Sequence, residues 1–281
     1  MAGVLVGETV GHVQALWRYP VKSMLGERLQ QLEVGPSGVC GDRGYALWDP
    51  ALGRVASAKN PRLWRGLLDY RASYASEPLP GAPLPPVTIR CPPLAGEDAT
   101  LSSSDADLAE QLSRRLGRQV SLLDRPPEAA SLDQYWPDVE GRQFQNVTNE
   151  LVLAEGSFFD ACPIHAISTA TLEQLRQLEP SCDFAVERFR PNLLIAPSGA
   201  APGFVEEGWI GATLRIGDQL ELAVEGGCPR CVITTLPQGD LPEDLAILRA
   251  TARHNQVVAG IRLSVVTPGS MALGDPVRLI P

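Results

Sequence analysis

The chain has 281 residues, of which 44% are hydrophobic, so it is long enough to bury the core of one large domain or two ordinary ones. A formal net charge of −9 argues against a broad nucleic-acid or anionic-membrane surface, because those partners reward summed positive charge. No apolar run of about 18 residues and no leader-like N-terminus occurs, and six cysteines are too few for a disulfide scaffold, so we expect a cytoplasmic protein with reduced thiols.

Alternation of apolar and polar residues predicts several strands along the chain. The clearest lie within residues 29–34, 45–47, 214–216, 220–224 and 277–279. Gly217-Asp218 predicts a hairpin turn, and Gly274-Asp275 predicts the entry to the last strand. The second half of the chain is therefore expected to be mainly antiparallel β structure.

Leucines spaced three or four residues apart predict three helices, over residues 105–117, 168–180 and 242–255. Asp105 is expected to cap the first of them. Few helices among many short strands predict a β-rich α+β fold that contains barrels or sandwiches. A Pro-rich stretch that begins at Arg125 indicates a domain boundary.

Arginine outnumbers lysine by 22 to 2, which makes the position of each lysine informative. Lys22 lies in a short segment, residues 19–23, that contains Pro20 and reads as extended. This placement indicates a specific need for charge, although a solvated surface lysine is the simpler alternative.

Cys228 and Cys231 form a Cys-x-x-Cys pair that allows four interpretations. Structural zinc requires further ligands that do not follow at the usual spacing. A thioredoxin-type dithiol requires a helix after the pair, whereas residues 232–235 are expected to continue as strand. The remaining possibilities are two buried structural cysteines, or one thiolate ligand for a soft or high-valent metal with Arg230 favouring the anion.

Two arginines precede an apolar strand in the segment Arg188-Phe189-Arg190-Pro191. Pro191 is expected to hold Arg190 in an extended conformation, with Arg188 pointing the same way, so that both guanidinium groups suit a phosphate. Ion pairs with Asp183 and Glu187 are the alternative. Ser168-Thr169, at a predicted helix start, caps the helix and adds a second possible anion contact through free N–H groups.

Other motifs contribute less to the functional assignment. Arg43 lies between two glycines and is expected on a turn, either solvated or directed at a ligand. The histidines His12, His165 and His254 are scattered and are interpreted as structural or surface residues. No nucleotide-binding glycine loop, nucleophile elbow or His-Glu-x-x-His motif occurs, so most hydrolase and nucleotide-binding classes lose support.

Four segments together resemble the MOSC-domain family, which includes the molybdenum cofactor sulfurase C-terminal domain and the mitochondrial amidoxime-reducing component. These segments are residues 16–23, 41–47, 189–192 and 230–235, and residues 274–277 resemble the family's usual end. The resemblance covers nearly the whole chain in the correct order. It implies an N-terminal MOSC-associated β-barrel domain over residues 1–125 and a MOSC β-barrel with a few helices over residues 126–281.

The resemblance also implies a molybdenum–molybdopterin cofactor (Moco) between the two domains, with Cys231 as metal ligand and catalytic residue. Lys59 stands where family members often carry arginine, which keeps the charge but loses the bidentate geometry. Cys228 is interpreted as a neighbour of the ligand. The predicted cofactor-binding residues are Lys22, Ser23, Arg43, Ser168, Thr169, Arg188, Arg190, Asn192 and Arg230.

The function that the resemblance implies is an oxidoreductase that reduces small N-hydroxylated or N-oxide-type compounds by oxygen-atom transfer. It would receive electrons from a separate ferredoxin- or flavoprotein-like protein, with no nucleic acid or membrane partner. Residues 124–149 are expected to line the substrate pocket. A cofactor carrier or sulfur-transfer module is the alternative, and a structural or zinc role of the cysteine pair is the third hypothesis.

Overall fold

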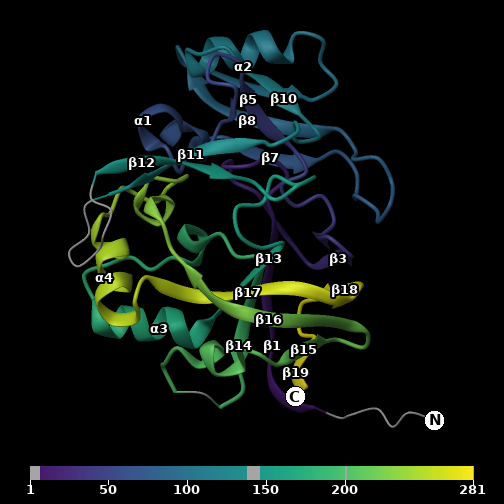
Figure 1. Ribbon diagram of the computed structural model, residues 1–281, viewed down its shortest axis with the longest axis vertical. Coiled ribbons are helices and arrows are strands. Elements are labelled where there is room, and N and C mark those ends of the chain that lie inside the picture. Colours follow the sequence, from purple (N-terminus) through teal and green to yellow (C-terminus); the bar gives the residue numbers. More distant parts are fainter. Residues whose placement is uncertain (1–6, 138–145, 200, 281) are drawn as a thin grey trace.

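A computed structural model describes residues 7–137, 146–199 and 201–280. Strands make up 41% and helices 19% of the structure, which confirms the predicted strand-rich α+β class. The molecule has an upper part formed by the N-terminal half and a lower part formed by a barrel (Figure 1). Residues 138–145 of the predicted substrate-lining segment lie outside the described residues.

A closed seven-stranded barrel forms the lower part of the molecule. Its strands, in spatial order, are β14 (Leu193–Pro197), β13 (Ile164–Ser168), β17 (Val258–Thr267), β16 (Leu220–Pro229), β15 (Thr213–Ile216), β19 (Pro276–Ile280) and β1 (Glu8–Arg18). The barrel closes because β1 pairs back to β14. All neighbouring strands are antiparallel except β13 and β14, which confirms the predicted strand type and the hairpin at Gly217-Asp218.

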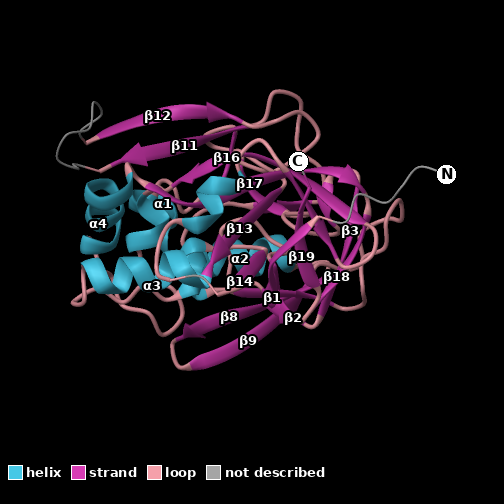
Figure 2. Cartoon of the chain, turned by 90° about the horizontal axis from the view of Figure 1, so that it is seen from below, coloured by secondary structure: helices cyan, strands magenta, loops and turns pink. Residues whose placement is uncertain are grey.

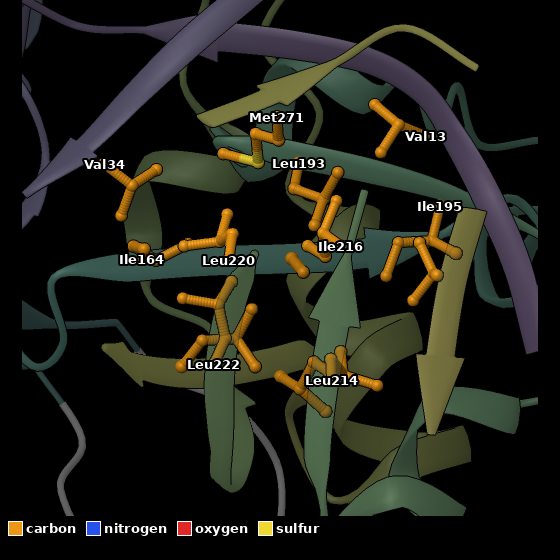
Figure 3. Packing of buried hydrophobic residues seen from close by; sticks show 14 of the residues in the cluster. Val13, Val34, Ile164, Leu193, Ile195, Leu214, Ile216, Leu220, Leu222 and Met271 are labelled. Atoms are coloured by element: carbon orange, nitrogen blue, oxygen red, sulfur yellow. The ribbon is translucent and has the colours of Figure 1, made fainter. Parts of the chain in front are cut away.

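Apolar side chains at alternate strand positions fill the barrel interior, where Figure 3 shows them converging. Leu214 and Ile216 on β15 face Leu222 on β16 in this cluster, and all three are fully buried. Because alternate residues of a strand point to opposite faces, the period-two pattern of the sequence directly selects this inward set. Each such side chain contributes about 1.5–3 kcal/mol through burial.

The barrel takes strands from both ends of the chain. β1 lies before the predicted boundary at residue 125, yet it pairs with β14 and β19. Further along the edge that β19 occupies, β1 pairs with β2 (Glu27–Leu29). A small sheet joins β18 (Gly269–Ala272), β3 (Gln31–Gly35) and β4 (Gly38–Val39). The boundary itself, between β10 (Ser121–Leu123) and β11 (Ser131–Trp136), stays a prediction.

Two three-stranded sheets form most of the upper part. Their strands are β7 (Arg71–Tyr74), β8 (Val87–Leu94) and β9 (Glu97–Ser102), and β10, β5 (Ala46–Asp49) and β6 (Arg54–Val55). They enclose a second core together with α1 (Pro61–Trp64), η1 (Arg65–Asp69) and α2 (Leu108–Leu116). The hairpin of β11 and β12 (Val147–Val152) lies at the junction of the two parts (Figure 1).

The three predicted helices are present, and the short α1 was not predicted. Asp107, not Asp105, is the N-cap residue of α2, because the Asp105 carboxylate accepts the Ser102 N–H instead. Of the two predicted capping residues, Ser168 caps α3 (Thr169–Leu178), and Thr169 is the first residue of the helix. The last helix, α4 (Ala246–Asn255), begins four residues later than Pro242. Helices α3 and α4 pack on one side of the barrel, as Figure 2 shows.

No helix among the described residues is long and apolar enough to cross a membrane.

Candidate functional site

A pocket of about 320 Å³ lies where the barrel meets the upper part of the molecule. The end of β16, the start of β14, the hairpin of β11 and β12, and loops of the N-terminal half all contribute to its walls. Three cysteines also line it, namely Cys162, Cys228 and Cys231. Its cationic side chains are Lys22, Arg43, Lys59, Arg190, Arg230 and Arg262. The pocket thus gathers cations and thiols from distant parts of the chain.

Cys231 lies two residues after Pro229, the last residue of β16, and is partly exposed to the pocket. The predicted strand over Val232–Thr235 is wrong, because this segment forms the 3-10 helix η4. Thr234 donates its hydroxyl to the Cys231 carbonyl, and Thr235 donates to the Val232 carbonyl. Such local side-chain bonds compete with strand pairing and explain why β-branched residues are helical here.

Arg230 connects Cys228 to the barrel wall. Its Nη1 donates to the Cys228 Sγ at 3.0 Å and lies 3.2 Å from His165 Nε2, and its Nη2 donates to the Phe189 carbonyl at 2.6 Å. The Arg230 Nε is buried and has no hydrogen-bond partner in the described structure. Burial, followed by the charge of Arg230, lowers the pKa of His165 well below its usual value. His165 is therefore a neutral residue of the pocket wall, a position that its sequence context did not indicate.

Arg190 has a left-handed backbone, with φ of 50° and ψ of 50°, so the predicted extended conformation is wrong. The 3-10 helix η2 (Val186–Phe189) ends there, and the Arg190 N–H donates back to the Glu187 carbonyl. Its Nη2 donates to the Met24 carbonyl at 2.7 Å, whereas its buried Nη1 has no partner among the described residues. Burial lowers the pKa of Arg190 to about 10.

Tyr19 supports two of the pocket cations. The Arg190 and Arg43 guanidinium carbons lie 4.3 Å and 4.5 Å from its ring centroid, within the range of cation–π contacts. Arg43 also pairs with the buried Asp42 carboxylate. Burial would lower the pKa of Arg43, but the Asp42 charge outweighs this and raises it. Arg43 thus occupies the turn that the flanking glycines predicted, and its charge is held in place.

Lys22 and Lys59 converge on one carboxylate. Asp160 accepts from the Lys22 Nζ at 2.5 Å and lies 3.1 Å from the Lys59 Nζ. Lys22 also donates to the Phe158 carbonyl at 2.6 Å, which rules out the solvated surface alternative for this lysine. Burial would raise the pKa of Asp160, but the two ammonium groups outweigh it and lower this pKa well below its usual range. Asp160 was not identified in the sequence analysis, where nothing marked it among the 33 acidic residues.

Two predicted anion contacts at the start of α3 are not part of the pocket. Ser168 is fully buried, and its hydroxyl donates to the Glu206 carboxylate at 2.6 Å while accepting the Thr171 N–H. Glu206 also accepts the Ser168 N–H and the Thr171 hydroxyl. The anion at this helix N-terminus is therefore a side chain of the chain itself. Neither Ser168 nor Thr169 lines the pocket.

Arg188 and Ser23 also lie outside the pocket lining. Arg188 is fully buried in η2 and donates to the Asp183 and Pro242 backbone carbonyls, so it does not point the same way as Arg190. Ser23 accepts the Ala58 N–H at 3.0 Å and thereby positions the loop that carries Lys59. Both residues hold backbone segments near the pocket through hydrogen bonds, and neither lines it.

Asn192 lines the pocket, but its side-chain amide forms hydrogen bonds with the backbone of two barrel strands. Its Oδ1 accepts the His165 N–H at 3.1 Å, and its Nδ2 donates to the Trp17 carbonyl at 3.3 Å. These bonds tie β14 to β13 and β1 immediately below the pocket.

Within the described residues, no group of three or more His, Cys, Asp or Glu side chains could hold a metal ion.

Comparison with known protein families matches both parts of the chain. The MOSC domain model matches residues 154–278, and the MOSC N-terminal beta barrel domain model matches residues 10–80. The chain belongs to the MOSC-domain family. All of the pocket's thiols lie within the first match, and Lys22, Arg43 and Lys59 lie within the second.

Two curated relatives span nearly the whole chain of this MOSC protein. Mitochondrial amidoxime reducing component 2 of Rattus norvegicus is 27% identical over 295 residues, covering 96% of this chain and 83% of its own. Mitochondrial amidoxime-reducing component 1 of Mus musculus is 26% identical, covering 97% and 83%. The solved YUAD protein of Bacillus subtilis aligns with a TM-score of 0.47 at 12% identity, over 96% of this chain and 95% of its own.

Proposed function

We propose that this MOSC protein is a molybdenum-cofactor-dependent reductase of small N-hydroxylated compounds. The observation that carries the proposal is the placement of the partly exposed Cys231 thiol beside cationic side chains whose guanidinium groups include two nitrogens without a partner among the described residues. The names of the rat and mouse relatives indicate the same substrate class. Electrons would come from a separate ferredoxin- or flavoprotein-like protein.

The residues of the pocket fit a molybdenum–molybdopterin cofactor. A phosphate needs several local donors, and Arg190 Nη1 and Arg230 Nε are buried donors that have no partner within the part of the chain that the structure describes. Leaving such charged donors unsatisfied is costly, which favours an anionic ligand. Cys231 offers the single thiolate that a soft or high-valent metal prefers. We assign Cys231 to the metal, and Arg190, Arg230, Arg43, Lys22 and Lys59 to the anionic pterin portion.

The proposed reaction converts an N-hydroxyl compound, two electrons and two protons into the corresponding N–H compound and water. The N–O bond breaks and the nitrogen is reduced, while the separate donor protein is oxidised. When bound, the cofactor supplies the two-electron oxygen-atom-transfer chemistry that amino-acid side chains lack. The protein contributes position, charge and exclusion of water.

The charges of the chain's own residues suit that task. Arg43 stays cationic because Asp42 raises its pKa, and Lys59 stays cationic because Asp160 and Cys231 outweigh the effect of burial and raise its pKa. Asp160 in turn fixes both lysine ammonium groups at the pocket wall. A preorganised cationic wall of this kind stabilises a bound anion without reorganising when it binds.

The proposal is tested by measuring molybdenum by mass spectrometry and the oxidised pterin by fluorescence, on protein made in a host that synthesises the cofactor. We expect near-stoichiometric molybdenum and pterin in the wild type and depleted metal in Cys231→Ala. Cys40→Ala is the matched control, because Cys40 is also partly exposed but lies outside this pocket. Wild-type protein without molybdenum, or loaded protein that reduces no N-hydroxylated compound with reduced methyl viologen, contradicts the proposal.

A cofactor carrier or sulfur-transfer module is the second candidate. The observation that favours it is the presence of Cys162 and Cys228 beside Cys231 in one pocket, since a reductase requires only one thiolate ligand. Stoichiometric release of cofactor to an apo-acceptor, without turnover, would support this function instead. The cytoplasmic location stays a prediction, and the curated relatives are named as mitochondrial.

A further inference from the structure

The pocket is lined by two chemically different kinds of side chain. Besides the lysines and arginines described above, the apolar side chains of Trp136, Leu151, Phe159 and Ile233 line it. An anionic cofactor belongs against the cationic side chains, which leaves the apolar ones for another ligand. Flat and apolar side chains of this kind are typical of sites that bind uncharged organic groups.

The hairpin of β11 and β12 presents one face to this pocket. Gln134 and Trp136 on β11 and Leu151 on β12 line it, and the register pairs Gln134 with Asn149 and Leu132 with Leu151. Side chains of alternate and directly opposed residues share a face, so these residues form one continuous surface. The Tyr135 N–H donates to the Lys59 carbonyl at 2.8 Å, which anchors this surface beside the cationic side chains.

Gln134 is the unusual residue of that face. It is only 6% exposed, it lines the pocket, and its side-chain amide makes no hydrogen bond to any residue that the structure describes. Its amide atoms are not among the fully buried polar atoms that lack a partner, so the amide opens to the pocket rather than to the apolar interior. An amide so placed can pair with a ligand that both donates and accepts a hydrogen bond.

We infer that Gln134 and the apolar face of the β11–β12 hairpin bind the substrate, and that they favour N–OH compounds on a flat apolar group over N-oxides. This inference rests on the proposed reductase function. An N–OH group both donates and accepts, so it can pair with the carbonyl and the NH₂ of Gln134 at once. An N-oxide oxygen only accepts and uses the NH₂ alone. Gln134 is a specificity-determining residue in this assignment.

The test compares benzamidoxime with quinoline N-oxide as substrates of the molybdenum-loaded protein, with reduced methyl viologen as electron donor. Gln134→Leu removes both partners, so we expect kcat/KM for benzamidoxime to fall about tenfold, equivalent to about 1.4 kcal/mol, and for the N-oxide to fall less. Gln134→Glu keeps the acceptor and repels the N-oxide oxygen. The ratio of the two kcat/KM values should therefore fall in Gln134→Leu and rise in Gln134→Glu.

Calorimetric binding of benzamidoxime to the oxidised, loaded protein gives a readout independent of turnover, and we expect Gln134→Leu to weaken it about tenfold. Thr148→Val is the matched control, because Thr148 opposes Tyr135 on the other face of the same hairpin and is exposed. Unchanged ratios in both variants overturn the inference while leaving the reductase function intact, and loss of molybdenum or pterin from Gln134→Leu overturns it by assigning Gln134 to the cofactor. Absence of turnover in the loaded wild type refutes the proposed function itself.

Discussion

Asp160 is the residue whose removal should most disturb the cofactor-free protein. It is the only carboxylate that the described structure places against either lysine, and the side chains of Lys22 and Lys59 are 5% and 11% exposed. Asp160→Asn keeps the shape but leaves two buried ammonium groups without a counter-ion. Removing one partner of a buried ion pair costs about 3–5 kcal/mol, because the remaining charge stays desolvated.

The Asp160 side chain is 28% exposed, so solvent screens part of this loss and the lower end, about 3 kcal/mol, is expected. For a chain of this size, that loss lowers Tm by about 6–12 °C. The contribution also depends on pH. The folded-state pKa of Asp160 is lowered, so its stabilisation is present above the unfolded pKa of about 3.9 and is lost as pH falls through the folded value.

Urea unfolding of cofactor-free wild type and Asp160→Asn at pH 7 measures this difference directly. Glu243→Gln is the matched control, because Glu243 pairs with Arg65 at 2.8 Å but both side chains are about half exposed. Its loss should cost less than about 1 kcal/mol. The difference in the free energy of unfolding between wild type and Asp160→Asn should also become smaller at alkaline pH. Burial lowers the pKa of Lys22, so this lysine loses its proton at a lower pH than an exposed lysine does. Equal stabilities of Asp160→Asn and Glu243→Gln at pH 7 would refute this reasoning.

Two further predictions concern buried polar groups of the barrel. Glu206→Gln should lower the free energy of unfolding by about 3 kcal/mol, because the carboxylate accepts from the Ser168 N–H and from the Ser168 and Thr171 hydroxyls. Urea unfolding checks this, and a loss below about 1 kcal/mol would contradict it. His165 has a lowered folded pKa, so the cofactor-free protein should lose stability as pH falls below about 6.5, at up to about 1.4 kcal/mol per pH unit. His165→Gln should reduce the pH dependence of the free energy of unfolding between pH 6.5 and 5. An unchanged pH dependence would mean that other groups cause it.

Local patterns in the sequence were sufficient for much of the fold. Period-two alternation identified β15 and β16 because their inward residues are all apolar, and Gly217 marked the turn between them. Ser168 marked the start of α3 through its capping hydroxyl. The four motifs that resemble MOSC proteins placed Lys22, Arg43, Arg190, Arg230 and Cys231, and the structure brings these five residues to one pocket. Each of these signals lies within a few neighbouring residues.

Other features depended on contacts between distant segments. Asp160 meets Lys22 across 138 positions and Glu206 meets Ser168 across 38, so no local pattern could reveal either pair. Arg188 has the same local chemistry as Arg190, yet one turn of η2 directs it to the backbone of Asp183 and Pro242 instead.

The sequence by itself determined the strand-rich class, the family and the thiol that faces the pocket, because each follows from side chains close together in the chain. Only the tertiary structure decided which guanidinium nitrogens lack a partner among the described residues and which pocket cations pair with the chain's own carboxylates. It also decided that Gln134, which no local pattern marks, lines the pocket with no hydrogen-bond partner among the residues that the structure describes. These points depend on burial and on pairing between residues far apart in the sequence, and both arise only when the whole chain has folded.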